Sequence, residues 1–254
     1  MENEVMAIPK QGPVVAIDGP AGTGKSSVTR RLADALGFVH VDTGALYRAV
    51  ALKCMDQQIE LLPDPTSETV TPIGPEHVKA AIEIARKIHL EFKRMPRKNP
   101  ANRIFSDGED VTSKIRTPEV STASSRVSSI PEVRAALLGL QRKLGCVGKA
   151  ILEGRDIGTV IFPDADVKFY MSATVEERAK RRLTELEAAG ADTPSFEEVK
   201  QQIAARDEAD TKRAVAPLRR ASDAVEIDTT PLTLDQVVEK MGSIVRERLK
   251  LAKS

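Results

Sequence analysis

The chain has 254 residues, which suffices for one large α/β domain or for a core that carries insertions. Its 38 basic and 37 acidic residues leave a net charge of +1. The two cysteines and three histidines form no disulfide framework or metal-ligand set. No apolar run approaches the ~20 residues of a membrane span. The acidic N-terminus also lacks the apolar stretch of a signal peptide. We therefore expect a cytoplasmic protein with neither a nucleic acid nor a membrane as a partner.

Short apolar runs alternate with helical patterns along the chain. Because each run is apolar throughout, the pattern predicts an α/β fold with a parallel sheet that helices cover on both faces. The predicted strands are Val14–Asp18, Val39–Asp42, Ala150–Glu153, Val167–Met171 and Ala224–Asp228. The predicted helices are Lys25–Leu36, Ala45–Met55, Val133–Leu144, Val175–Ala188, Phe196–Arg206 and Leu234–Leu249.

The motif Gly-x-x-x-x-Gly-Lys-Ser occupies residues 19–26, between the first predicted strand and an amphipathic helical pattern. Its glycines allow backbone angles that other residues avoid, so consecutive N–H groups can converge on phosphate oxygens. Lys25 can reach the outer phosphates, and the Ser26 hydroxyl is placed to ligate Mg²⁺. The segment therefore predicts a site for a nucleoside triphosphate.

A second polar segment, Asp42-Thr43-Gly44-Ala45-Leu46-Tyr47-Arg48, follows the second predicted strand. Thr43 either caps the next helix or contacts a ligand, and the sequence leaves both roles open. Arg48 lies one turn into that helix, near the strand ends where parallel sheets bind their ligands. Because phosphoryl transfer depends on cations that position both phosphate groups, Arg48 is a candidate for holding an anionic acceptor.

Residues 62–117 break the alternation of strands and helices. They open with a proline-rich connection that runs to Pro75, and a short helix is predicted around Glu76–Arg86. Apolar and polar residues then alternate over Ile88–Phe92, as on a half-buried antiparallel strand, and Asp107-Gly108 is typical of a hairpin turn. We expect a small α+β insert here.

Residues 184–213 are highly charged, and Gly190–Pro194 separates two helical stretches within them. This composition predicts a mobile helical flap, because lids need few buried apolar contacts. Residues 121–129 are rich in serine but keep their apolar residues at helical spacing, so we expect a helix rather than a linker.

Two charged segments are candidates for the acceptor site. Glu153-Gly154-Arg155-Asp156 lies just past a buried strand, where it forms either a surface ion pair or a ligand site. On the flap, Arg206, Asp210 and Arg213 share one helical face if the helix continues. A solvated charged surface is the alternative there. The same alternative applies to Arg178, Lys180, Arg181 and Arg182, although arginines on a flap can neutralise charge on a transferred phosphoryl group.

Four motifs together resemble those of bacterial cytidylate kinases, which are P-loop nucleoside-monophosphate (NMP) kinases. The motifs are I-D-G-P-x-G-x-G-K-S at 17–26, D-T-G-A-L-Y-R at 42–48, G-R-D-I-G-T-V-I-F-P at 154–163 and R-A-V-A-P-L at 213–218, and the likeness covers about residues 13–250 in order. The resemblance implies transfer of the γ-phosphoryl group of ATP to CMP or dCMP, with Mg²⁺ delivered as Mg-ATP. It also implies a P-loop NMP-kinase fold, in which a five-stranded parallel core with helices on both faces spans 13–61, 118–183 and 214–254, a small α+β NMP-binding insert spans 62–117 and a short helical lid spans 184–213.

The resemblance also implies roles for individual residues. ATP would be held by Gly19, Pro20, Ala21, Gly22, Thr23, Gly24, Lys25, Ser26 and Ser27, with Ser26 on the metal. CMP would be held by Thr43, Tyr47, Arg48, Ser125, Arg134, Arg155, Asp156, Arg206, Asp210 and Arg213, and the catalytic residues would be Lys25, Arg155, Arg178, Arg182 and Arg213. Within the CMP set, Arg48, Arg155 and Arg213 would bind the acceptor phosphate. Ser125, Arg134 and Asp156 would contact the cytosine edge, and Arg206 and Asp210 the ribose.

Three features depart from the family pattern. Thr43 replaces a common serine, Glu153 stands where an aspartate is frequent, and the loop at 96–100 looks like an insertion.

The main alternative is a P-loop kinase with another nucleoside monophosphate or shikimate as its acceptor, although residues 154–163 and the large insert disfavour shikimate. A GTPase switch would need an Asn-Lys-x-Asp motif, which the sequence lacks. An ATPase acting on nucleic acid would need more aromatic residues than six Phe and two Tyr. We expect a monomer, because no long heptad or apolar stripe predicts an interface.

Overall fold

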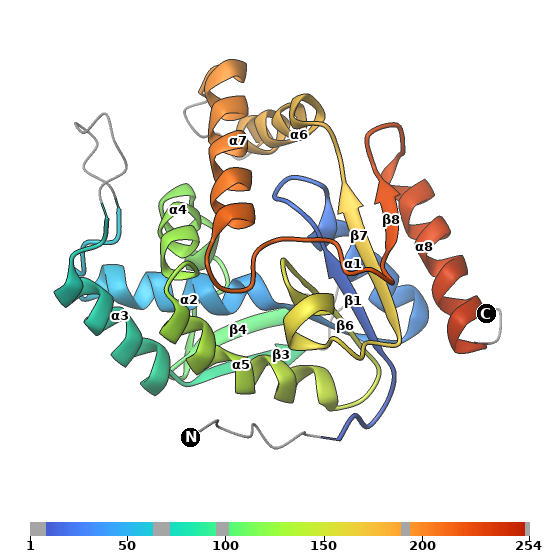
Figure 1. Ribbon diagram of the computed structural model, residues 1–254, viewed down its shortest axis with the longest axis horizontal. Helices are drawn as coiled ribbons and strands as arrows, with labels where there is room; N and C mark the ends of the chain where they lie inside the picture. The colour runs from blue at the N-terminus through green and yellow to red at the C-terminus, as the bar shows by residue number, and fades with distance from the viewer. Residues whose placement is uncertain (1–8, 63–71, 95–101, 189–193, 252–254) are drawn as a thin grey trace. The chain divides into compact units, whose positions relative to one another are not determined.

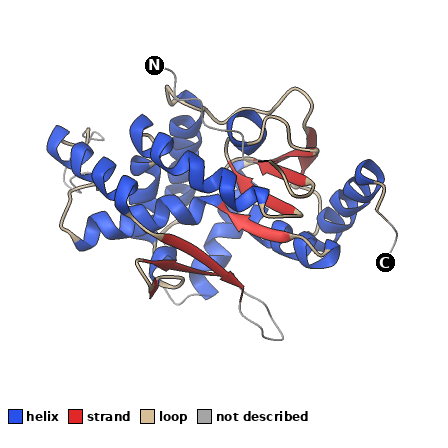
Figure 2. Cartoon of the chain, turned by 90° about the horizontal axis from the view of Figure 1, so that it is seen from below, coloured by secondary structure: helices blue, strands red, loops and turns tan. Residues whose placement is uncertain are grey.

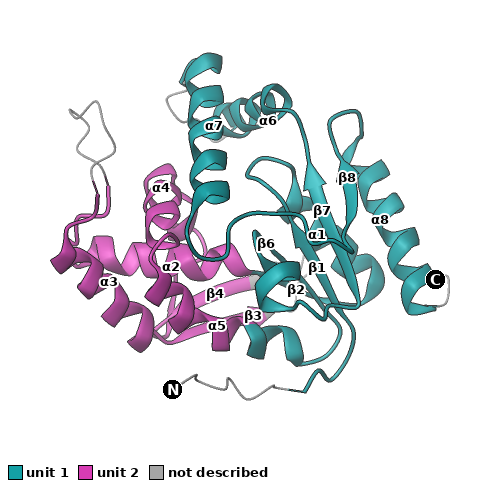
Figure 3. Cartoon of the chain, in the orientation of Figure 1, with its two compact units in different colours: residues 1–42, 142–254 teal, residues 43–141 magenta. Residues whose placement is uncertain are grey.

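The computed structural model describes residues 9–62, 72–94, 102–188 and 194–251. Its contacts divide the chain into two compact units (Figure 3): unit 1 comprises Met1–Asp42 and Arg142–Ser254, and unit 2 comprises Thr43–Gln141. The predicted insert at 62–117 lies within the range of unit 2 and the predicted lid at 184–213 within that of unit 1. The division into core, insert and lid stays a prediction. The first part of the proline-rich connection, the loop at 96–100 and residues 190–193 lie outside the described residues.

Unit 1 is built on a five-stranded parallel sheet with the order β2-β6-β1-β7-β8. Figure 2 shows the strands of the chain in red. Every residue of β1 is buried, because this apolar strand lies in the middle of the sheet. The parallel sheet expected from the sequence is thereby confirmed. Its strands are β1 (Val14–Asp18), β2 (Val39–Asp42), β6 (Ala150–Gly154), β7 (Val167–Ser172) and β8 (Val225–Asp228).

Helices α1 (Lys25–Leu36) and α8 (Leu234–Leu249) pack on one face of this sheet and share one core with it (Figure 1). Ile151 of β6 belongs to that core, whereas Leu152 points to the opposite face because neighbouring side chains of a strand alternate. There the end of α5 (Pro131–Cys146) approaches closely, since a Cβ on Gly145 would lie 2.5 Å from the Phe162 ring and 3.1 Å from Leu152. The sheet therefore has cover on both faces.

Helices α6 (Val175–Ala188) and α7 (Phe196–Lys212) form a pair around a small apolar cluster that includes Ala179 and Val199. The Ser195 hydroxyl and the Glu198 carboxylate cap the start of α7 reciprocally. The predicted end of this helix at Arg206 is wrong, because α7 continues to Lys212. No glycine or proline interrupts those additional turns.

Unit 2 contains a three-stranded antiparallel sheet of β3 (Leu90–Arg94), β4 (Asn102–Ser106) and β5 (Glu109–Asp110). Asp107 and Gly108, both with positive φ, form the predicted hairpin turn between β4 and β5. The helical elements of this unit are α2 (Thr43–Asp56), α3 (Pro75–Lys87), the 3₁₀ turn η1 (Lys114–Arg116), α4 (Pro118–Val127) and most of α5. The predicted small sheet, its preceding helix and the helix in the serine-rich stretch are confirmed.

None of the helices in the described part of the chain has both the length and the apolar composition that a membrane span requires.

Candidate active site

The phosphate-binding loop joins the end of β1 to the start of α1. Gly19, Gly22 and Gly24 have φ values of 151°, 77° and 84°, which lie in the region that favours glycine. A Cβ on Gly19 would lie only 2.2 Å from the carbonyl oxygen of Met171, at the end of the neighbouring strand β7. The loop therefore passes too close to the sheet backbone for any larger residue at position 19.

Lys25, the first residue of α1, folds back over this loop. Its Nζ donates to the carbonyl oxygen of Pro20 at 2.6 Å, and the Thr23 hydroxyl donates to the same oxygen at 3.1 Å. Burial lowers the pKa of Lys25 well below its usual range, and the nearby charges of Arg155 and Arg206 lower it further. A phosphate at the loop would supply the negative charge that this buried ammonium needs.

Ser26 begins a chain of hydrogen bonds that crosses the sheet. Its Oγ donates to Oε2 of Glu153 at 2.8 Å, and Oε1 of the same carboxylate lies 2.7 Å from Nε2 of His40. Burial lowers the pKa of His40, but the hydrogen bond and charge of Glu153 outweigh it, so the net shift is upward.

The residues at Ser26 fit a magnesium ion that arrives with a nucleotide. A hydroxyl and a carboxylate offer the hard oxygen atoms that Mg²⁺ prefers, and at kinase sites the substrate phosphates supply further ligands. Within the described ranges, no three His, Cys, Asp or Glu side chains form a metal cage of their own. The donor set thus suits an ion bound largely through phosphate and water.

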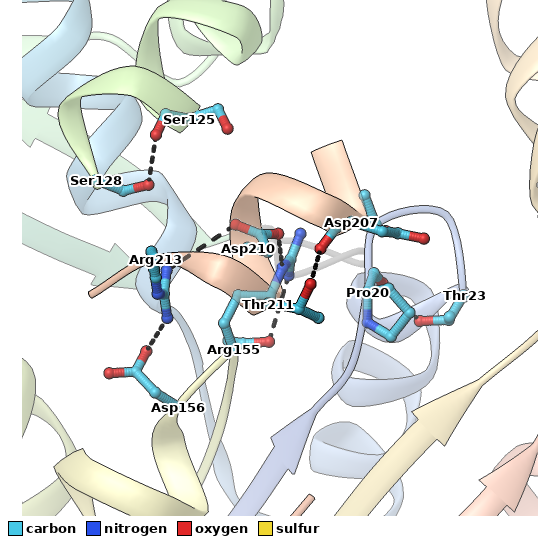
Figure 4. A network of polar contacts seen from close by, with 12 residues as sticks. Pro20, Thr23, Ser125, Ser128, Arg155, Asp156, Asp207, Asp210, Thr211 and Arg213 are labelled. Carbon is cyan, nitrogen blue, oxygen red and sulfur yellow. Dashed lines mark hydrogen bonds and ion pairs between the residues drawn. The ribbon is translucent and has the colours of Figure 1, made fainter. Parts of the chain in front are cut away.

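A second group of charges lies beyond the end of β6, and we call it the arginine cluster. Nε of Arg155 donates to Asp210 at 2.8 Å, and Nη2 of Arg213 donates to Asp156 at 3.4 Å. Figure 4 shows the Arg213 guanidinium between the carboxylates of Asp156 and Asp210. The cluster consists of Arg155, Arg206 and Arg213 with Asp156 and Asp210.

The arginine cluster carries more cations than carboxylates. Burial would raise the pKa of Asp210, but the charges of Arg155, Arg206 and Arg213 hold it below the usual value. The same Arg155 and Arg206 repel the Lys25 ammonium, so the cluster and the phosphate-binding loop share one electrostatic field. This arrangement favours an additional anion within unit 1.

Asp18 ties the two parts of the site together. Its carboxylate accepts the N–H groups of Ile157 at 2.8 Å and Gly158 at 2.7 Å, at the start of the π-helical turn η2 (Ile157–Ile161). Burial raises the pKa of Asp18 to about 6, although these two hydrogen bonds act in the opposite direction. The last residue of β1 therefore fixes the backbone that carries Arg155 and Asp156.

Arg178 and Arg182, both predicted to be catalytic, lie in different surroundings. Arg178 is buried and donates to the carbonyl oxygen of Ala21 in the loop at 3.1 Å and to both carboxylate oxygens of Asp207, at 3.0 and 2.6 Å. Arg182 is partly exposed and donates to Glu185 on its own helix at 3.2 Å. The structure thus connects Arg178 with the phosphate-binding loop and does not bring Arg182 to it.

Unit 2 holds the other half of the predicted CMP residues. The guanidinium carbon of Arg134 lies 5.3 Å from the centroid of the Tyr47 ring, and Nη1 of Arg134 donates to the Ser128 carbonyl oxygen at 3.3 Å. Nε2 of the buried Gln141 donates to the Tyr47 hydroxyl at 3.4 Å. These contacts hold Tyr47 and Arg134 together on helices α2 and α5.

The remaining residues of that half lie on α2 and α4. Thr43 is buried and is itself the first residue of α2, so the structure places it inside the helix rather than before it as a cap. Arg48 lies on the same helix, and Ser125 lies on α4, where its carbonyl oxygen accepts the Ser128 hydroxyl at 2.9 Å.

The predicted site residues therefore form two sets. Unit 1 brings together Lys25, Arg155, Asp156, Arg206, Asp210 and Arg213, with Arg178 on the loop. Unit 2 brings together Tyr47 and Arg134, and carries Thr43, Arg48 and Ser125. That the two sets meet on one CMP molecule stays a prediction.

Three residues of the site have functions that we did not predict from the sequence. In the sequence, Asp18 ends a predicted strand at the edge where parallel sheets bind their ligands, His40 is one of three scattered histidines and Asp207 belongs to a charge run. A carboxylate that ends a fully apolar strand is a signal for Asp18, because such a buried charge needs hydrogen-bond donors. No comparable signal marks His40 or Asp207, whose partners lie far away in the sequence.

Comparisons with known proteins agree with the geometry. The family model described as "Cytidylate kinase" matches residues 15–247. The chain is 46% identical to the cytidylate kinase of Geobacter sulfurreducens over 239 residues. This alignment covers 94% of the chain and 95% of that relative. It is 42% identical over 237 residues to the cytidylate kinase of Anoxybacillus flavithermus, covering 93% of this chain and 97% of that one. The bifunctional pantoate ligase/cytidylate kinase of Gloeobacter violaceus is 41% identical to this chain over 237 residues. This alignment covers 93% of the chain and 43% of that longer protein.

Proposed function

The chain belongs to the cytidylate kinase family, and we propose that it transfers the γ-phosphoryl group of ATP to CMP or dCMP. The products are ADP and CDP or dCDP, so the enzyme is a phosphotransferase with a phosphate group as acceptor. The observation that carries the proposal is the pairing of two anion sites within unit 1. One is the phosphate-binding loop with its buried Lys25, and the other is the arginine cluster beyond β6.

The donor site in this proposal is the phosphate-binding loop. The backbone N–H groups of residues 19–27 other than Pro20, together with the ammonium of Lys25, hold the phosphates of ATP. On binding, Lys25 exchanges the Pro20 carbonyl oxygen for a phosphate oxygen, which is the stronger, charge-assisted partner. The Ser26 hydroxyl would hold Mg²⁺, with Glu153 beside it, and the ion would supply positive charge to the outer phosphates.

The acceptor residues in this proposal are those that the resemblance to the family implies. Arg48, Arg155 and Arg213 hold the CMP phosphate, and Arg206 and Asp210 hold the ribose. Ser125, Arg134 and Asp156 contact the cytosine edge, with Thr43 and Tyr47 beside the nucleotide. The 4-amino group of cytosine donates hydrogen bonds and therefore suits the oxygen atoms of Asp156 or Ser125. The 4-oxo group of uracil only accepts hydrogen bonds, so it would lie against the Asp156 carboxylate, another acceptor, without a hydrogen bond.

The proposed reaction is an in-line displacement. An oxygen of the CMP phosphate bonds to the γ-phosphorus while the bond from that phosphorus to the β,γ-bridging oxygen breaks, and ADP leaves. No general base is required, because the acceptor oxygen is already anionic. Lys25, Arg155, Arg178 and Arg213 position and neutralise the phosphate groups. Arg182, which contacts Glu185 on its own helix, joins them when the helical lid closes, and that closure excludes water and so limits hydrolysis of ATP.

The surroundings of the protein are also part of the proposal. We infer a cytoplasmic enzyme that acts as a monomer. Its two cysteines, Cys54 and Cys146, are both buried and form no disulfide, which suits a reducing compartment.

A coupled assay of ADP release tests the proposal. Mg-ATP is combined in turn with CMP, dCMP, UMP, AMP, GMP and shikimate, and turnover is expected with CMP and dCMP at much higher kcat/KM than with the others. Turnover with AMP or shikimate but not with CMP would replace the proposal by another kinase activity of the same fold.

A further inference from the structure

We propose that His40 is a positioning residue for the magnesium-binding hydroxyl of Ser26 and that it acts through Glu153. The inference rests on the proposed Mg-ATP site and adds a residue to it. His40 lies on β2, Glu153 on β6 and Ser26 on α1, so the three side chains come from three elements of unit 1.

Each carboxylate oxygen of Glu153 contacts a hydrogen-bond donor. Oε2 accepts the Ser26 hydroxyl at 2.8 Å, and Oε1 lies 2.7 Å from Nε2 of His40. The Glu153 side chain is 5% exposed and that of His40 is 14% exposed, so water has little access to the bond between these two side chains. Since a carboxylate only accepts hydrogen bonds, Nε2 of His40 carries the proton in this contact.

The direction of the first bond explains why the position of Glu153 matters for a metal. When Ser26 donates its proton to Glu153, the lone pairs of its oxygen point away from that carboxylate. These lone pairs are the groups that a cation at the phosphate-binding loop would use. A fixed Glu153 therefore presets the Ser26 hydroxyl for the ion before the nucleotide arrives.

Glu153 needs an anchor because it has an alternative partner. Its charge also acts on the buried ammonium of Lys25. Glutamate has one more rotatable bond than the aspartate that we noted as frequent at this position, so it can swing more widely. Without His40, Oε1 would lose this buried donor, and we expect the carboxylate to turn toward Lys25. It would then release Ser26 and compete with phosphate for the lysine.

The expected effect is a loss of magnesium affinity rather than a loss of ATP affinity in general. Replacement of residues that orient metal ligands typically weakens metal binding by about 10–100-fold. We expect His40→Leu to fall near the lower end of this range, because Ser26 itself stays in place.

The experiment measures ATP binding by titration calorimetry with the full chain, once in excess EDTA and once in saturating Mg²⁺. The ratio of the two affinities is the contribution of the metal. His40→Leu removes the donor, and His40→Gln keeps an N–H group at a similar distance from the backbone. Val39→Ala is the control on the same strand, since Val39 is 42% exposed. Thermal unfolding of each variant without ligand shows whether it is folded.

We expect His40→Leu to lower this ratio about ten-fold and to raise the Mg²⁺ concentration needed for half-maximal turnover by a similar factor. At saturating Mg²⁺ its kcat should return to within about two-fold of wild type, and His40→Gln should restore most of the ratio. An unchanged ratio in a folded His40→Leu variant would overturn the inference. Equal losses in EDTA and in Mg²⁺ would do the same, because they indicate a structural role.

The wild-type protein separates this inference from the proposed function. If Mg²⁺ does not strengthen ATP binding to the wild type, the proposed Mg-ATP site fails, and the inference falls with it. If Mg²⁺ strengthens binding to the wild type and equally to His40→Leu, only the inference about His40 fails.

Discussion

The phosphate-binding loop and the arginine cluster present positive charge in two different ways. The loop uses its backbone, and the close approach of Gly19 to the carbonyl oxygen of Met171 fixes its path. The cluster uses long arginine side chains, and the carboxylates of Asp156 and Asp210 hold the guanidinium groups of these side chains in position. An anion that enters the loop meets N–H groups with set directions, whereas an anion that enters the cluster must share the arginines with carboxylates that are already bound.

This difference suggests how donor and acceptor are distinguished. A triphosphate is common to many nucleotides, so a rigid backbone cradle serves it without reading the base. The acceptor must be chosen, and the carboxylates that hold the arginines are also suited to contact the base and the ribose. Variants of the two parts should therefore fail differently: loop variants with every acceptor, and cluster variants with some acceptors more than others.

The largest effect is expected from Lys25→Ala, which breaks the loop. Removal of a preorganised cation or donor aimed at developing charge typically lowers kcat about 10²–10³-fold. The loss should be the same factor with CMP, dCMP and UMP in the ADP-release assay, because Lys25 contacts only the donor. Lys240→Ala, an exposed lysine on α8, is the control. A loss confined to one acceptor would contradict the proposed position of Lys25.

The next effect concerns Asp18, which joins the loop to the cluster. Its pKa of about 6 in the folded protein lies above the ordinary value of 3.8. Between pH 3.8 and pH 6 the folded state therefore binds more protons than the unfolded state, so the free energy of unfolding falls as the pH rises through this range. The full penalty is roughly 3 kcal/mol above pH 6, and about 1 kcal/mol of it should appear between pH 5 and 7.5.

Asp18→Asn removes this titration. Urea unfolding at pH 5 and 7.5 should show that the stability of the wild type relative to Asp18→Asn decreases toward the higher pH. The exposed Val39→Ala variant changes no titratable group and should leave the pH dependence of the wild type unchanged. A difference between wild type and Asp18→Asn that is independent of pH would show that Asp18 does not titrate in this range.

An effect that depends on the acceptor is expected from Asp156→Ala, which breaks the cluster. Loss of an acceptor for the 4-amino group should lower kcat/KM for CMP about 10–100-fold and affect UMP less, so the gap between the two substrates narrows. The ADP-release assay with both acceptors measures this gap. Equal losses with CMP and UMP would mean that Asp156 only holds Arg213 in place.

The smallest effect is expected from Gly24→Ala, a second change in the loop. Gly24 has a φ of 84°, but a Cβ there would meet no atom within 4 Å, so the cost is that of the backbone conformation alone, about 1 kcal/mol of unfolding free energy. Gly19→Ala should cost clearly more in the same urea titration, because its Cβ collides with backbone. Equal costs for the two variants would show that the loop can move away from β7.

Much of the fold could be predicted because the apolar pattern is strong. β1, α1, α6 and α8 have the predicted bounds, since buried strands read as unbroken apolar runs and these helices begin or end at recognisable residues such as Thr233 and Gly37. The end of α7 was predicted too early, because charged residues continue a helix without any apolar periodicity to mark it.

The site was predictable where its chemistry depends on local sequence. The glycines and Lys25 of the loop lie within a few residues of one another, so a motif identifies them. The bonds from Glu153 to His40 and from Arg178 to Asp207 join residues that only the folded chain brings together. Resemblance to a family supplied Arg134 and Asp210 as candidates, but the cation–π contact of Arg134 with Tyr47 and the ion pair of Asp210 with Arg155 are visible only in the structure.

The strand order of unit 1 also determines when the protein can fold during synthesis. β1 is made first, yet Val14 pairs with Ala150 and Val15 with Val167, so its partners leave the ribosome only after the whole of unit 2. Contacts between such distant segments form slowly, and unpaired apolar strands attract other chains. We expect the segment Val-Val-Ala-Ile of β1 to stay without its partner strands on the nascent chain until β7 emerges. The strand that ends in the phosphate-binding loop therefore has the longest delay between its own synthesis and the synthesis of its partner strands.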